Sequence, residues 1–441
     1  MTPVSHARVL RIAAPIVISN ATVPLLGAVD TAVVGQMGQA APIGAVGLGA
    51  VVLASVYWIF GFLRMGTTGL VAQAKGEGDS LEISAGLIRA VGIGLAAGLC
   101  LIALQAPMLW AAFQIAPASA EVERLAQDYL SIRIWGAPAT ISLYAFTGWL
   151  IALERTRAVL VLQLLMNGLN VGLDLLFVLG LGWGVKGVAA ATLIAELSGL
   201  ALALWLSRSA LVPGLSRAVI LAAAPLKQMA RVNTDIMIRS VLLQGSFTAF
   251  LFLGAGQGDV KLAANQVLLQ FLEITAYALD GFAFAAESLV GQAVGARAPR
   301  SLRRAAVVAS QWGVAGAALL SALFLIFGGA IIDTMTTAPE VRETARAYLP
   351  WMGLAPLLGI AAWMFDGIFI GATLTREMRN AMLISVAIYI AALCALIPAF
   401  GNHGLWAALM VLNLARGVTM ARLYPRAEAK AAPAQGGAAP L

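Results

Sequence analysis

Acidic side chains stand inside long apolar stretches of this sequence, where an ionised group is costly and needs a physical reason. Asp30 lies in the stretch 9–34, and Asn170 and Asp174 lie four residues apart in the stretch 159–179. A spacing of four places both side chains on one helical face. Apart from Arg11 at the start of the first stretch, neither stretch contains a basic residue, so we expect these acids to be protonated or to hold a cation. The alternative is that they only hold helices together through hydrogen bonds.

A second polar group follows one face of the stretch 262–289. Its members recur every seven residues, close to two helical turns, and are Gln266, Glu273, Asp280 and Glu287. Lipid cannot face such a stripe, so it must line water or other helices. Asp366, in the stretch 347–372, is a candidate for the same space. We predict that Glu273, Asp280 and Asp366 line a substrate cavity. For Asp235 and Arg239, four residues apart, we expect a local salt bridge.

The elements that carry these residues are transmembrane helices. The chain of 441 residues is 61% hydrophobic and 11% charged, whereas soluble domains are about a quarter charged. Each apolar stretch of about 20 residues can cross a hydrocarbon core as a helix. We predict an all-α polytopic membrane protein with twelve spans, at 9–34, 43–63, 85–107, 129–153, 159–179, 187–206, 234–255, 262–289, 305–331, 347–372, 381–400 and 404–424.

The basic residues give the orientation. With the N-terminus in the cytoplasm, 21 of the 28 Lys and Arg fall on the cytoplasmic side, six lie toward the other side, and Arg239 lies within a span. This distribution follows the positive-inside rule. We therefore expect a multi-pass protein of the bacterial cytoplasmic (inner) membrane with both termini cytoplasmic. A basic surface for nucleic acid would instead cluster on one soluble face.

The sequence also contains an internal repeat. Shifting the chain along itself until Leu70 meets Leu289 aligns Leu70–Gly76 with Leu289–Gly295, and the same shift aligns Thr156 and Arg157 with Thr375 and Arg376. We call this shift the repeat offset. Six spans in each copy give two parallel repeats, an organisation typical of secondary transporters. We predict an N-lobe at 1–206, a cytoplasmic linker at 207–231, a C-lobe at 232–426 and a disordered tail at 427–441.

Several motifs resemble the multidrug and toxic compound extrusion (MATE) family, and its DinF branch in particular. The resemblance covers nearly the whole chain, and its motifs are Val29–Gly35, Gly69–Ala74, Asn170 with Asp174, Asp280–Ala286 and Asp366–Thr373. It implies two six-helix lobes forming a V around a central cavity and alternating access coupled to H⁺ or Na⁺. It places the cation-coupling site at Asp30, Asn170, Asp174, Thr192 and Tyr129, with Asp30 and Asp174 as the acids of a Na⁺ site. The seventh helix has no clear equivalent of the acid that some members carry there, whereas Asp366 matches the acid of the tenth helix.

These observations favour a cation-coupled antiporter that exports amphipathic, often cationic small molecules, because acidic cavity walls attract cations. The alternatives are a flippase of lipid-linked precursors, a passive channel and a membrane-embedded enzyme. No catalytic or metal-ligand motif is present, and His6 and His403 lie near opposite membrane faces, so we do not expect an enzyme. We expect a monomer in contact with membrane lipids and no cofactor besides the coupling ion.

Overall fold

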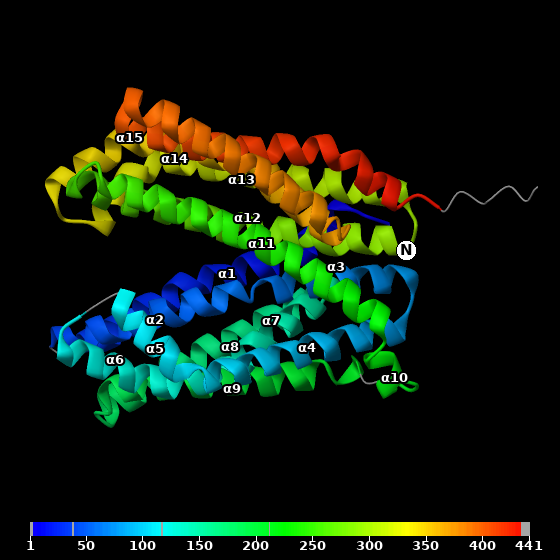
Figure 1. Cartoon of the computed structure of the whole chain (residues 1–441), viewed down its shortest axis with the longest axis horizontal. Helices are drawn as coiled ribbons and strands as arrows, with labels where there is room; N and C mark the ends of the chain where they lie inside the picture. The colour runs from blue at the N-terminus through cyan, green and yellow to red at the C-terminus, as the bar shows by residue number, and fades with distance from the viewer. Residues whose placement is uncertain (1–2, 38, 116–117, 211, 434–441) are drawn as a thin grey trace, which may run out of the picture. The chain divides into compact units, whose positions relative to one another are not determined.

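The computed structural model describes residues 3–37, 39–115, 118–210 and 212–433 (Figure 1). Over these residues it consists of helices joined by short turns and contains no strand. The longer helices are α1 (His6–Gly35), α2 (Ala40–Ile59), α3 (Phe62–Glu77), α4 (Ser80–Ala103), α5 (Gln105–Ile115), α6 (Ala120–Arg133), α7 (Ala137–Ala152), α8 (Thr156–Asp174), α9 (Gly184–Leu206), α11 (Ala223–Ala255), α12 (Asp259–Gly295), α13 (Pro299–Met335), α14 (Pro339–Gly371) and α15 (Thr375–Lys430). A four-residue helix, α10 (Arg217–Ile220), lies in the predicted linker.

The helices account for the predicted spans. Ten helical segments of the described residues are long and apolar enough to cross a membrane. The 56-residue α15 is one of these segments, and it contains a break at Gly401, where φ is 55° and ψ is −128°. The break separates the eleventh and twelfth predicted spans, and the 30-residue α1 covers the first. The all-helical fold class predicted from hydropathy is therefore confirmed.

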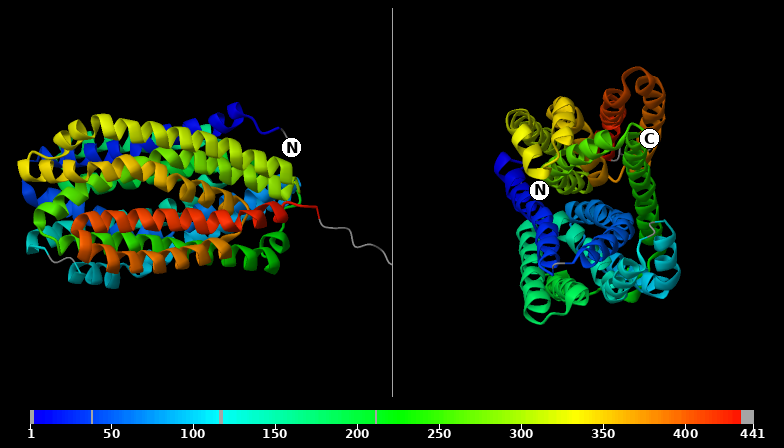
Figure 2. Two further views of the ribbon diagram at one scale, coloured as in Figure 1. Left: turned by 90° about the horizontal axis from the view of Figure 1, so that it is seen from above. Right: turned by 90° about the vertical axis from the view of Figure 1, so that its left-hand side faces the viewer.

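The helices pack into two compact units. The amino-terminal unit comprises Ile18–Thr67 and Ser80–Met229, and the carboxy-terminal unit comprises Met1–Val17, Thr68–Asp79 and Ala230–Leu441. In the first, α8 packs on α9, and α6 packs on both α2 and α9. In the second, α12, α13 and α14 run side by side (Figure 2). The lobe boundaries at 206 and 232 stay predictions.

The backbone repeats with the same offset as the sequence. Left-handed φ angles occur at Gly78 (80°) and Arg297 (50°), which are related by the repeat offset. They occur again at Glu154 (60°) and Thr373 (50°), a second pair with the same relation. Residues other than glycine rarely adopt this conformation, so its return at equivalent positions indicates two copies of one local structure.

The repeated motif packs against its own copy within the carboxy-terminal unit. A Cβ atom on Gly76 would overlap the carbonyl oxygen of Gln292, and one on Gly295 would overlap the carbonyl oxygen of Gln73. Gln292 is the counterpart of Gln73 at the repeat offset, as Gly295 is of Gly76, so the contact is reciprocal. Glycine is required at both positions because the backbones of α3 and α12 meet there without space for a side chain.

The last helix continues through Lys430, past the start of the tail predicted from residue 427. Two contacts hold this extension. Lys430 Nζ donates to the carbonyl oxygen of Ala372 at 2.7 Å, at the end of α14. Arg303 donates two hydrogen bonds to the Glu428 carboxylate, at 2.8 and 2.6 Å. Residues 434–441 of the predicted tail lie outside the described residues.

Candidate cation-coupling site

Two carboxyl groups from different helices meet inside the amino-terminal unit. Asp30 lies near the end of α1, and Asp174 is the last residue of α8, immediately before a short π-helical segment, Leu175–Gly180. Such segments widen a helix locally and occur often at functional sites. The Asp174 side chain is fully buried, and no donor group among the described residues bonds either of its oxygens or Oδ1 of Asp30.

The two acids lie near enough to act on each other electrostatically. Without a proton, the site presents two negative charges at short range in a buried environment. Such an arrangement is unfavourable unless a cation or a proton compensates it.

Three helices each contribute a pair of polar residues to this neighbourhood. On α6 these are Tyr129 and Arg133, on α8 Asn170 and Asp174, and on α9 Thr192 and Glu196, each pair four residues apart and on one helical face. Asn170 Nδ2 donates to Thr192 Oγ1 at 3.1 Å, and Thr192 Oγ1 donates to the carbonyl oxygen of Val188 at 3.0 Å. A Cβ atom on Gly49 of α2 would overlap the Tyr129 ring, so this close approach requires glycine.

The structure thus brings together the five residues predicted for this site. Tyr129 interacts electrostatically with Asp30 and with Arg133. Among the described residues, Asn170 Oδ1 is buried without a donor, as are both oxygens of Asp174. Carboxylate and amide oxygens without a donor among the described residues therefore lie on one face of α8. Their role as a coupling site stays a prediction.

A buried ion pair beside the acids was not foreseen. Arg133 Nη1 donates to Glu196 Oε2 at 2.7 Å, and the two residues are 7% and 6% exposed. The charge of Arg133 also acts on Asp30 and Asp174. The argument that these acids have no basic residue nearby was therefore wrong, because a third helix, α6, supplies one. The sequence did contain a signal for this pair: Arg133 lies in the predicted span 129–153, and Glu196, with the opposite charge, lies in the predicted span 187–206.

The polar face of α8 extends further than predicted. Gln163 Nε2 donates to Asn167 Oδ1 at 2.9 Å, and Asn167 Nδ2 donates to Thr22 Oγ1 of α1 at 2.7 Å. With Asn170 and Asp174, these residues follow one another at spacings of four, three and four, which is one helical face. Through Asn167 this face is hydrogen-bonded to α1.

The residues predicted for the substrate cavity lie in the carboxy-terminal unit. Along the stripe of α12, Gln266 and Glu273 are exposed, Asp280 is half-buried and Glu287 is buried. The neighbouring Leu279 is fully buried, so Asp280 and Leu279 occupy different faces of the helix. That Glu273, Asp280 and Asp366 line a substrate cavity stays a prediction.

Asp366 has two basic partners that the sequence did not suggest. Arg239 of α11 and Arg416 of α15 both donate to Asp366 Oδ2, the latter at 2.7 Å. The three residues are 6–9% exposed. The prediction of a salt bridge between Asp235 and Arg239 was therefore wrong, because Arg239 pairs with Asp366. Asp235 instead pairs with Arg379 at 2.6 Å.

The reason for this correction lies in burial. A pairing between neighbours on one helix stabilises an exposed helix by only about 0.2–0.5 kcal/mol. The buried Asp366 carboxylate needs cationic partners from the helices that surround it. Two guanidinium groups on one carboxylate leave a net positive charge, which disfavours a bound cation there.

An internally repeated set of long apolar helices, with charged groups buried between them, defines a multi-pass transporter of the membrane. Comparison with known proteins identifies it further. The family model MatE matches the chain twice, over residues 15–176 and 236–396, once in each repeat. The chain belongs to the MATE family of transporters and is not an enzyme.

The relatives agree with this assignment. The chain is 38% identical over 418 residues to the DNA damage-inducible protein F of Escherichia coli, covering 94% of this chain and 91% of that protein. It is 28% identical to a probable multidrug resistance protein NorM of Rhizobium meliloti, covering 89% of each. A crystal structure of MATE in the straight conformation matches with a TM-score of 0.87, 19% identity and 96% coverage of both chains, which shows the shared fold.

Proposed function

We propose that this chain is a cation-coupled antiporter that exports amphipathic, often cationic small molecules across the bacterial cytoplasmic membrane by alternating access. Asp30 and Asp174 would bind the coupling ion, H⁺ or Na⁺. The observation that carries this proposal is that no donor of the described residues bonds the two oxygens of the buried Asp174, which lies next to a second acid. Family membership and the name of the NorM relative support multidrug export.

Binding of the ion would change the packing of α1 against α8. Charge on the pair disfavours close approach of the two helices, and protonation or a bound cation removes that repulsion. Because Asp30 and Asp174 lie on different helices, the ion acts on a contact between them, and α1 carries Pro15 and Pro24 at which it can bend. A contact with two arrangements can connect ion binding to substrate release.

We further propose that the carboxy-terminal unit has no cation site. Asp366 is the acid that the resemblance to the family places there, and it already has two arginine partners. Its role would be to hold α11, α14 and α15 together.

The experiment is efflux of a fluorescent cation from proteoliposomes, with a proton gradient and a sodium gradient imposed separately. We expect Asp30→Asn and Asp174→Asn each to reduce gradient-driven efflux to the rate of empty liposomes, while substrate binding in detergent persists. The matched control is Asp128→Asn in the same unit, because its pair with Lys186 at 3.4 Å is partly exposed. Normal accumulation by either variant would show that the residue does not couple transport.

A further inference from the structure

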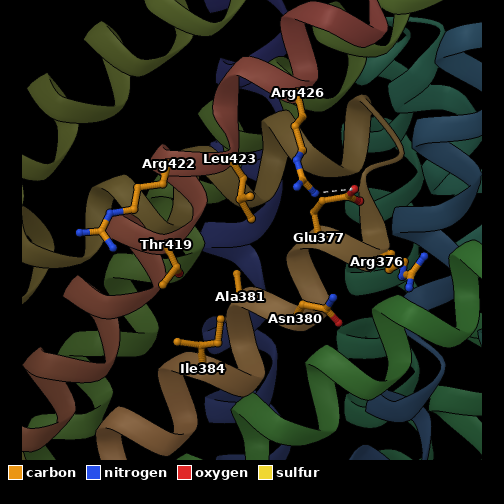
Figure 3. Close-up of a pocket in the computed structure, with 9 residues that line it drawn as sticks. All are labelled: Arg376, Glu377, Asn380, Ala381, Ile384, Thr419, Arg422, Leu423 and Arg426. Atoms are coloured by element: carbon orange, nitrogen blue, oxygen red, sulfur yellow. Dashed lines mark hydrogen bonds and ion pairs between the residues drawn. The ribbon is translucent and has the colours of Figure 1, made fainter.

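A cavity of about 580 Å³ lies between the two arms of α15, residues 375–400 and 402–430 (Figure 3). Arg376 and Glu377 border it from the first turn of the first arm, and Arg422 and Arg426 border it from the second arm. We call this cavity the α15 arginine pocket. It belongs wholly to the carboxy-terminal unit and is separate from Asp30 and Asp174.

The pocket carries an excess of positive charge. Among the described residues, Arg376 and Arg422 form no hydrogen bond or ion pair, and Arg426 meets Glu377 at 3.4 Å. Three arginines and one glutamate therefore border the pocket, and the Arg376 and Arg422 side chains extend away from the Glu377–Arg426 pair (Figure 3). The first turn of α15 also borders the pocket, and the free N–H groups of a helix start favour an anion. The missing partner is thus a negatively charged group.

Arginine binds phosphate particularly well, because its planar fork donates two parallel hydrogen bonds to phosphate oxygens. Below the arginines the pocket wall is apolar and includes Ile384 and Leu423. Both arms also expose apolar side chains beyond the pocket, with Ile390 at 54% and Val418 at 49%. In a membrane protein such side chains are covered by lipid chains. The ligand should therefore combine a phosphate with an apolar part.

The internal repeat shows that the fold does not require Arg422 and Arg426. Gly401 and Gly182 both have left-handed φ angles and are related by the repeat offset. The same offset places Ala203 opposite Arg422 and Ser207 opposite Arg426, so neither arginine has a basic counterpart at that position in the other half. These two arginines of the pocket are thus an addition to the duplicated scaffold.

We propose that the α15 arginine pocket binds the phosphate of an anionic phospholipid, whose acyl chains lie along the apolar side chains of the two arms. The pocket lies where α15 carries its basic residues, and basic pockets between transmembrane helices are typical sites for anionic headgroups. Arg376 and Arg422 border the pocket from opposite arms, and on binding their exposed side chains would turn toward the phosphate. A bound lipid would connect the arms across the end remote from the break at Gly401 and stabilise the folded chain.

The test uses the full chain in detergent, with bound lipid counted by native mass spectrometry and thermal unfolding followed in parallel. Phosphatidylglycerol, phosphatidylcholine and inorganic phosphate are titrated separately. We expect phosphatidylglycerol to bind roughly tenfold more tightly than phosphatidylcholine, a difference of about 1.4 kcal/mol, and to raise the unfolding temperature. The double variant Arg376→Gln/Arg422→Gln should lose this preference and remain folded, because both side chains are exposed and, among the described residues, unpaired.

The matched control is Arg157→Gln/Arg217→Gln, which removes two exposed arginines from the other unit. Arg157 is the counterpart of Arg376 at the repeat offset. This control should keep the preference for phosphatidylglycerol. Three results would overturn the proposal: an unchanged preference in the pocket variant, an equal loss in the control, or displacement of the lipid by millimolar inorganic phosphate. None of them bears on ion coupling, since the pocket does not include Asp30 or Asp174.

Discussion

Replacing Asp366 by asparagine separates a structural role for this acid from a cation-binding role. The carboxylate is 9% exposed, and Arg239 and Arg416 both bond its Oδ2 atom. Asp366→Asn removes the negative charge and leaves two buried guanidinium groups with no counter-charge. Removing one partner of a buried pair costs about 3–5 kcal/mol, because the remaining charge is uncompensated. We expect a loss of that size in the free energy of unfolding.

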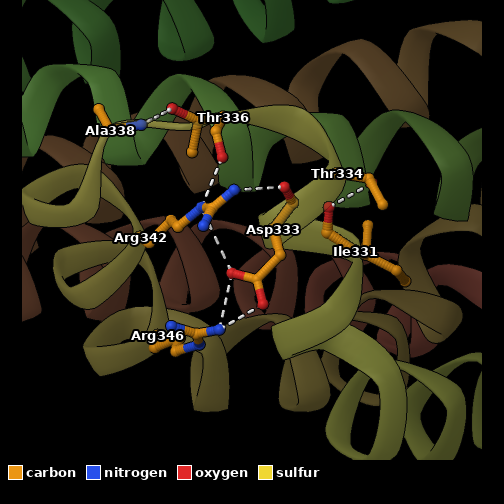
Figure 4. Close-up of polar contacts among 7 residues, drawn as sticks. All are labelled: Ile331, Asp333, Thr334, Thr336, Ala338, Arg342 and Arg346. Atoms are coloured by element: carbon orange, nitrogen blue, oxygen red, sulfur yellow. Dashed lines mark hydrogen bonds and ion pairs between the residues drawn. The ribbon is translucent and has the colours of Figure 1, made fainter.

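The chain offers a matched control on its surface. Asp333 also has two arginine partners, Arg342 at 3.5 Å and Arg346 at 2.6 Å, but its side chain is 39% exposed (Figure 4). Solvent screens this pair, so exposed pairs of this kind contribute about 0–1 kcal/mol. Asp333→Asn should therefore change stability little, although it removes the same charge from the same kind of cluster.

The assay is reversible unfolding in mixed detergent micelles, followed by tryptophan fluorescence, with both variants measured under the same conditions. If Asp366 bound a transported cation, its neutral variant would stay close to the wild type in stability and would lose cation-dependent protection. The reasoning is refuted if Asp366→Asn destabilises the protein no more than Asp333→Asn does.

Three further predictions concern topology, packing and the α12 stripe. Cysteines introduced at Ser209 and Gln257 should react with impermeant reagents from opposite sides of the membrane, and labelling of both from one side would contradict the orientation. Gly295→Ala should destabilise the chain by about 1–3 kcal/mol in thermal unfolding, since the added methyl overlaps the Gln73 carbonyl oxygen, and an unchanged stability would mean that α3 and α12 can move apart. Asp280→Asn should reduce transport of cationic substrates more than it reduces the yield of folded protein, as measured by efflux and by size-exclusion chromatography, and equal losses would indicate a structural role.

The helices and the repeat were predictable because they depend on composition and periodicity along the chain. Apolar stretches long enough to span a membrane gave the helices, and the repeat offset returned in the backbone angles of Gly78 and Arg297. The shared face of Asn170 and Asp174 was predictable for the same reason, since a spacing of four on a helix leaves little freedom.

Partners on different helices were not predictable. Arg133 and Glu196 are 63 residues apart, and Arg239 and Asp366 are 127 residues apart. Which helix faces lie together is decided by packing of the whole bundle, which one sequence does not reveal. The rule for neighbours on a helix therefore paired Asp235 with Arg239 incorrectly, because it compares only residues within one helix.

The duplicated scaffold carries different charges in its two halves, and in the proposed coupling this difference would direct one ion to one half. At the repeat offset Asp174 corresponds to Leu393, and Asp366 corresponds to Thr147, so neither acid was kept in the other copy. In the amino-terminal unit, the negative charge of ionised Asp30 and Asp174 is larger than the positive charge of Arg133, which is already bonded to Glu196. In the carboxy-terminal unit, the two positive charges of Arg239 and Arg416 are larger than the single negative charge of Asp366. A cation is thus attracted to the first cluster and repelled from the second. We therefore expect ion binding to change the packing of α1 and α8, while the helices around Asp366 keep one arrangement throughout the cycle.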